Sequence, residues 1–131
     1  MVCMNRLKVT LKHIFSKDSL HIVEFSFCDE PLYMMSLELN QNIVVGAQVE
    51  IGIKPTHVAI MEEFSVRNSF VNQVRVSIVN IEYGELLCSI KGALNGEILE
   101  AVITTKACDR LQLGVGESVV MVLPASEIAI L

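Results

Sequence analysis

A short donor-rich segment, residues 65–69 with the sequence Ser-Val-Arg-Asn-Ser, is the part of the chain best suited to hold a ligand. It places two hydroxyls, a guanidinium and an amide just before a stretch that alternates like a β-strand. All four groups donate hydrogen bonds, so they suit a tetrahedral oxyanion, whose oxygens accept hydrogen bonds but donate none. The structural alternative is a linker in which Arg67 pairs with Glu62 or Glu63.

No other set of side chains predicts catalysis. The histidines, His13, His21 and His57, are scattered, and none lies in a recognisable nucleophile motif. The sequence contains neither a Walker glycine loop nor a GxGxxG motif. The four cysteines lack CxxC spacing, which favours reduced thiols over a metal site. We therefore expect a binding protein rather than an enzyme.

Composition limits the partners. The net charge of −5, without a run of Lys or Arg, argues against nucleic acid, and aromatics at 5% supply few base-stacking platforms. No stretch is long and apolar enough for membrane insertion, and the first residues lack the layout of a secretion signal, so we expect a cytoplasmic protein. Hydrophobic residues make up 52% of the 131 residues, which predicts burial between subunits as well as within one, in a homo-oligomer that is a dimer or a trimer.

The second half of the chain repeats the first. Sliding the sequence along itself superimposes Asn5 on Asn72 and other residues in the same order, and a slightly larger shift then superimposes Gly46 on Gly116. The change in the shift predicts a small insertion near 104–109. A repeat of this kind indicates two related units that pack together or across chains, here 1–63 and 64–131.

Periodicity and turn residues predict an all-β chain. The expected strands are 7–11, 20–27, 32–37, 48–54 and 57–61 in the first half, and 73–81, 86–90, 98–103, 117–123 and 127–131 in the second. We expect turns at 16–19 and at Asn95-Gly96, and a short helix over 104–111 that begins with Thr104. The polar stretch 38–42 fits either a helical turn or a loop. Short strands at this spacing are typical of a small barrel.

The second half also resembles a known family. Residues 65–68, Ser-Val-Arg-Asn, are similar to the Ser-Ala-Arg-Asn sequence that opens the Mop (TOBE) domain of molybdate- and tungstate-handling proteins. The similarity continues through Leu94-Asn95-Gly96, Ala101–Thr104 and Leu111–Gly114, and ends in Pro124–Ile128. The first half is similar more loosely. Its ending, 52–58, resembles the C-terminal regulatory region of importer ATPases of the ABC class.

The resemblance implies a fold and a set of ligand residues. The fold is a pair of tandem five-stranded OB-like barrels, with a short helix in the second and oxyanion pockets at interfaces. The implied ligands of molybdate or tungstate are Ser65, Arg67, Asn68, Thr104 and Ser126, with Lys54 from the first half. Lys54 is included because Pro124 stands where the family has a lysine, and the family serine three residues after Thr104 is Ala107 here.

Two functions follow from the resemblance. The first is binding of molybdate or tungstate, for intracellular storage or for regulation of an importer, with an ABC importer ATPase or permease as partner. The second is a ligand-free oligomerisation or regulatory domain of an ABC-importer ATPase or transcription regulator. The first is favoured by the retained Ser65, Arg67, Asn68 and Thr104, whereas Pro124 and Ala107 favour the second. Neither predicts turnover by this chain.

Overall fold

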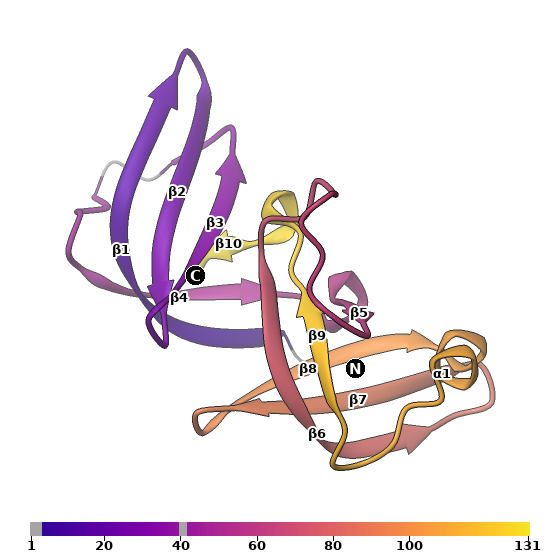
Figure 1. The fold of residues 1–131 in the computed structure, drawn as a ribbon. Coiled ribbons are helices and arrows are strands. Elements are labelled where there is room, and N and C mark those ends of the chain that lie inside the picture. The colour runs from indigo at the N-terminus through magenta and orange to yellow at the C-terminus, as the bar shows by residue number, and fades with distance from the viewer. Residues whose placement is uncertain (1–3, 40–41) are drawn as a thin grey trace.

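Runs of alternating apolar and polar residues form the strands of two five-stranded antiparallel sheets (Figure 1). The computed structural model describes residues 4–39 and 42–131. The elements of the first half are β1 (Asn5–Lys17), β2 (Leu20–Phe27), β3 (Glu30–Ser36), β4 (Gln48–Ile53), the 3₁₀ turn η1 (Pro55–His57) and β5 (Ala59–Met61). Those of the second half are β6 (Gln73–Tyr83), β7 (Leu87–Leu94), β8 (Glu97–Thr104), α1 (Thr105–Leu111), β9 (Ser118–Val122), the 3₁₀ turn η2 (Ala125–Glu127) and β10 (Ala129–Ile130). The chain is all-β with one short helix, as the sequence predicts.

Each half of the chain contributes its last strand to the sheet of the other half. The strand order is β10-β4-β1-β2-β3 in the first sheet and β5-β9-β6-β7-β8 in the second. Thus β5 from the first half pairs with β9, and β10 from the second half pairs with β4, as the yellow strand beside β3 and β4 in Figure 1 shows. The division of the chain into two repeated units, 1–63 and 64–131, stays a prediction from the sequence. The structure adds that each sheet draws a strand from both of them.

The sequence repeat reappears in the details of the strands. The β1–β2 ladder shifts register between Leu11 and His13, and the β6–β7 ladder shifts at the equivalent place in the second half, between Ile78 and Asn80. A bulge of this kind bends a strand and increases its twist. Because both sheets bend at equivalent residues, they curl in the same way into the two halves of the tandem fold.

Two buried asparagines join the halves reciprocally. Asn5 and Asn72 are the buried polar residues of the described chain, 7% and 1% exposed. The Asn5 amide exchanges two hydrogen bonds of 2.8 Å with the backbone of Glu100 on β8. The Asn72 amide does the same with Tyr33 on β3, at 2.8 and 2.7 Å, and also donates to the Leu123 carbonyl at 2.8 Å. Tyr33 and Glu100 occupy equivalent places in the repeat, as Asn5 and Asn72 do, so the same contact is made in both directions.

The turns and the helix follow the sequence with one difference. Asn95 and Gly96 adopt positive φ angles of 48° and 82° in the β7–β8 hairpin, as predicted. The expected turn at 16–19 is shorter, because β1 continues to Lys17 and Ser16 pairs with His21. Helix α1 lies at the predicted insertion. Of the stretch 38–42, residues 40 and 41 lie outside the described part. Within residues 4–39 and 42–131, no helix is long and apolar enough to span a membrane.

Candidate functional site

Ser65, Arg67 and Asn68 lie together on the loop that connects β5 to β6. The Asn68 side chain fixes this loop from within. Its carbonyl oxygen accepts a hydrogen bond of 2.8 Å from the Phe70 N–H, and its amide donates one of 3.1 Å to the Ser65 carbonyl. Bonds from an Asn side chain to its own following backbone form an Asx turn. Asn68 therefore sets the course of the backbone around Arg67.

Gln73, the first residue of β6, holds the same loop from the sheet. Its amide oxygen accepts from the Ser65 N–H at 2.9 Å, and its nitrogen donates to the carbonyls of Ser65 and Phe70 at 2.7 and 2.8 Å. Gln73 is not among the residues predicted from the sequence to form this site. The only signal for it was a polar residue at the start of a predicted strand, directly after the donor-rich segment.

Arg67 projects from this loop into solvent. Among residues 4–39 and 42–131, none forms a hydrogen bond or ion pair with its guanidinium. The suggested pairing of Arg67 with Glu62 or Glu63 is not what the structure shows, because Glu63 pairs with Arg75. Arg75 also donates to the Ser118 hydroxyl at 2.9 Å and lies over the Phe64 ring, 4.8 Å from its centroid. The loop is thus anchored by Arg75, and the guanidinium of Arg67 stays available to a ligand.

Thr104 caps helix α1, as the sequence predicts. Its hydroxyl oxygen accepts a hydrogen bond of 3.1 Å from the Ala107 N–H, which satisfies one of the unpaired donors of the first turn. The neighbouring Thr105 hydroxyl donates to the Gly84 carbonyl at 2.8 Å and so ties the helix start to the end of β6. Thr104 is exposed and lines a hollow with Lys106 and the exposed Leu86.

Lys54 and Ser126 belong to the two 3₁₀ turns, which the fold brings side by side. Lys54 immediately precedes η1, and Ser126 is the middle residue of η2; both are exposed. His57 Nδ1 lies 3.1 Å from Glu127 Oε2 and joins the turns directly. His57 and Glu127 stand at matching places in the two halves, so the contact links equivalent positions of the repeat.

The predicted ligand residues therefore form three groups in one chain. Ser65 and Asn68 line one hollow of about 470 Å³, Thr104 lines a second, and Ser126 lines a third. Each group offers hydrogen-bond donors at the surface, and Arg67 and Lys54 bring positive charge. Such groups can neutralise and orient an oxyanion. They contain no nucleophile held against a base.

A buried thiol cluster lies under α1. Cys88 and Cys108 are fully buried, and the Cys88 thiol lies 3.5 Å from the Thr105 hydroxyl. Burial raises the pKa of the Cys108 thiol, which also contacts Cys88 and the Tyr83 hydroxyl. The hydrogen bond with Cys108 in turn raises the pKa of Tyr83. No group of three or more His, Cys, Asp or Glu side chains in the described residues is placed to hold a metal ion.

Comparison with known proteins shows what this chain is similar to. Residues 68–130 match the family model described as the TOBE domain. No curated protein sequence matches the chain. Among solved structures, the chain is similar to the cytoplasmic molybdate-binding protein ModG in a crystal form with molybdate bound. The identity is 23%, the TM-score is 0.89, and the match covers 96% of this chain and 94% of that one. Residues 68–130 are thus similar to the TOBE domain, and the chain as a whole has the tandem OB-like fold of that structure.

Proposed function

We propose that this protein binds a tetrahedral oxyanion, molybdate or tungstate, in the cytoplasm. The observation that carries the proposal is the loop around Arg67. Asn68 and Gln73 hold it in shape through five hydrogen bonds to its backbone, while the guanidinium of Arg67 is left without a protein partner among the described residues. A pre-shaped loop of this kind lowers the ordering cost of binding. The fold shared with a molybdate-bound structure supports the same ligand.

The full ligand set is completed between chains in this proposal. In one chain, the hollow beside Ser65 and Asn68 is separate from those lined by Thr104 and Ser126. The loop also exposes apolar side chains, since Val66 is 97% and Phe64 51% exposed. Exposed apolar residues next to polar ligand groups are typical of an interaction surface. A dimer or trimer would bury them and bring the guanidinium of one copy towards the hydroxyls of the next.

The biological role that fits best is storage or buffering of the anion. Regulation of an ABC importer is a second role that would use the same anion binding. The proposed ligands donate hydrogen bonds or carry positive charge, so they bind and release an anion without converting it. A ligand-free oligomerisation domain is the competing function. Pro124 in place of the family lysine and Ala107 in place of the family serine favour it.

Titration of the Arg67→Ala variant tests the proposal. Heats of binding would be measured for molybdate, tungstate and sulfate on the wild type, on Arg67→Ala, and on Arg110→Ala, which removes an exposed arginine from α1 instead. Loss of a charged hydrogen-bond donor should weaken molybdate binding by about 1.5–3 kcal/mol. Thermal stability should be unchanged, because an exposed arginine contributes little to it.

The outcomes separate the two functions. Binding to the wild type that Arg67→Ala weakens and Arg110→Ala does not would support oxyanion binding. Absence of heat with the wild type, together with a lower melting temperature or a smaller oligomer for Arg67→Ala, would instead support the ligand-free oligomerisation domain. Solution mass with and without molybdate would show whether the site needs more than one chain.

A further inference from the structure

Two buried thiols, Cys88 on β7 and Cys108 on α1, lie under the helix and take no part in the proposed oxyanion site. Both side chains are 0% exposed, and both are free thiols in this structure. Cys108 is the buried residue of α1, so it is the side chain through which the short helix packs against the sheet. A covalent bond at this place would therefore join the helix to the core of the second half.

The hydrogen bonds of Thr105 bring the two sulfurs together. The Thr105 hydroxyl lies 3.5 Å from the Cys88 sulfur and donates to the Gly84 carbonyl at 2.8 Å. The Thr105 N–H donates to the Leu86 carbonyl at 2.9 Å, which fixes the start of α1 to the turn between β6 and β7. Cys108 is three residues further along the helix, so it lies on the same face as Thr105, and its thiol contacts Cys88. A disulfide requires two cysteines that are neighbours in space, and these two are.

A surface hollow of about 230 Å³ leads towards one of the two sulfurs. Its lining includes Cys88, Leu87 and Tyr83, but not Cys108. Leu87 and Tyr83 are 53% and 60% exposed, and side chains at the surface change rotamer within nanoseconds, so a small reagent can pass them. Burial raises the pKa of the Cys108 thiol, so that sulfur keeps its proton at neutral pH. Cys88 is therefore the sulfur that a reagent meets first, and Cys108 stands ready to attack it afterwards.

We propose that Cys88 and Cys108 are a redox-active pair, which a peroxide converts into a disulfide between β7 and α1. The Cys88 sulfur attacks one oxygen of hydrogen peroxide and the O–O bond breaks. Cys88 becomes a sulfenic acid, and its proton leaves with the other oxygen as water. The Cys108 sulfur then attacks the Cys88 sulfur and expels hydroxide, which takes up the Cys108 proton to form a second water. The two thiols lose two electrons in total, and these reduce one peroxide to two waters.

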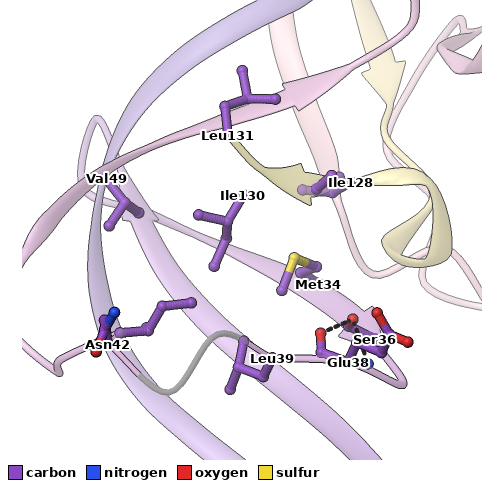
Figure 2. A pocket seen from close by; sticks show the side chains of 11 residues that line it. Met34, Ser36, Glu38, Leu39, Asn42, Val49, Ile128, Ile130 and Leu131 are labelled. Carbon is purple, nitrogen blue, oxygen red and sulfur yellow. Dashed lines mark hydrogen bonds between the residues drawn. The ribbon is translucent and has the colours of Figure 1, made fainter.

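The thiol pair is particular to the second half of the chain. Under the repeat, Cys88 corresponds to His21, and Cys108 falls in the predicted insertion. Figure 2 shows the segment after β3, which is the first-half equivalent of the helix start; there the Ser36 hydroxyl donates to the Glu38 carbonyl. The pair therefore accompanies α1 and is not a general property of this barrel.

A variant that keeps only these two thiols tests the proposal on the full chain. Substitution of the other cysteines, Cys3→Ser and Cys28→Ser, leaves Cys88 and Cys108. The folded variant would be treated with hydrogen peroxide, its remaining thiols would be alkylated under denaturing conditions, and the chain would be digested with trypsin. Circular dichroism before digestion would show that the treated chain is still folded.

The masses of the tryptic peptides identify the bridge. Trypsin places the two thiols on peptides 76–91 and 107–110, neither of which contains a methionine that peroxide would oxidise. We expect one product with the summed mass of both peptides less two hydrogen atoms, which dithiothreitol separates. Cys108→Ser in the same background is the matched control and should give no linked product. The proposal would be overturned if peroxide leaves both thiols of the folded chain free, if it oxidises them to sulfinic acids without a linked product, or if a gel without reductant shows that the link joins two chains.

Discussion

Removal of the buried Asn72 amide should cost more stability than any other single polar substitution in the interior. In Asn72→Ala, the Tyr33 N–H, the Tyr33 carbonyl and the Leu123 carbonyl each lose a hydrogen bond of 2.7–2.8 Å. Asn72 is 1% exposed, so water has little access to the side of these groups that faces it. Each bond contributes about 1 kcal/mol net, and a buried partner left unsatisfied costs about 1–3 kcal/mol.

The expected loss follows from adding these contributions. The two partly buried Tyr33 groups should cost about 1 kcal/mol each and the Leu123 carbonyl about 1–3 kcal/mol, giving about 3–5 kcal/mol for Asn72→Ala. Asn5→Ala removes only the two bonds to Glu100 and should cost about 2 kcal/mol. A loss of the size expected for Asn72→Ala is a large part of the roughly 5–15 kcal/mol that typically separates folded from unfolded domains.

Urea unfolding of three variants measures these values. Asn80→Ala, at an exposed position of β6, is the control and should change the free energy of unfolding by less than about 0.5 kcal/mol. Asn72→Asp keeps an acceptor for the Tyr33 N–H but buries a carboxylate against the Tyr33 and Leu123 carbonyl oxygens, so at neutral pH it should destabilise at least as much as Asn72→Ala. The reasoning would be refuted if Asn72→Ala lost less than about 1 kcal/mol, or less than Asn5→Ala.

Two further predictions concern packing and pH. In Gly92→Ala, the new Cβ would clash with Val76 Cγ2, so overpacking should lower the free energy of unfolding by about 1–3 kcal/mol, as a thermal melt would show. Because burial raises the pKa of the Cys108 thiol above its ordinary 9.0, the folded state holds that proton more tightly than the unfolded chain. Its contribution to stability is present below the ordinary value and lost as pH rises through the folded-state pKa. Melting temperatures across the alkaline range should fall less steeply in Cys108→Ala than in the wild type.

Local patterns explain why the order of the elements could be predicted from the sequence. The two repeat shifts and the alternation of apolar residues indicate the strands in both halves, and Asn95-Gly96 gives the hairpin because both residues tolerate positive φ. Thr104 marks the start of α1 because its hydroxyl caps the first turn. Each of these signals lies within a few residues of the structure it forms.

Features that depend on distant partners could not be predicted in the same way. The runs 57–61 and 127–131 read as strands, but alternation does not say which sheet a strand joins, so the exchange of β5 and β10 was not foreseen. Two contacts depend on where β6 and β9 place their side chains. They are the ion pair of Glu63 with Arg75 and the hydrogen bonds from Gln73 to the loop. The donor-rich segment could be found in the sequence, whereas the contacts of Gln73 and Arg75 that hold it in place could not.

The exchange of strands also decides where mechanical load enters the molecule. The first strand, β1, and the last, β10, lie on opposite sides of β4 in one sheet. A segment attached before β1 and another attached after β10 would therefore both pull on the first sheet. The β10–β4 ladder joins only Ala129 to Gly52 and Ile130 to Ile51, so tension would separate it early. We expect the sheet that contains β6, β7, β8 and β9 to keep its shape until β10 leaves β4, after which the load passes through η2 to β9.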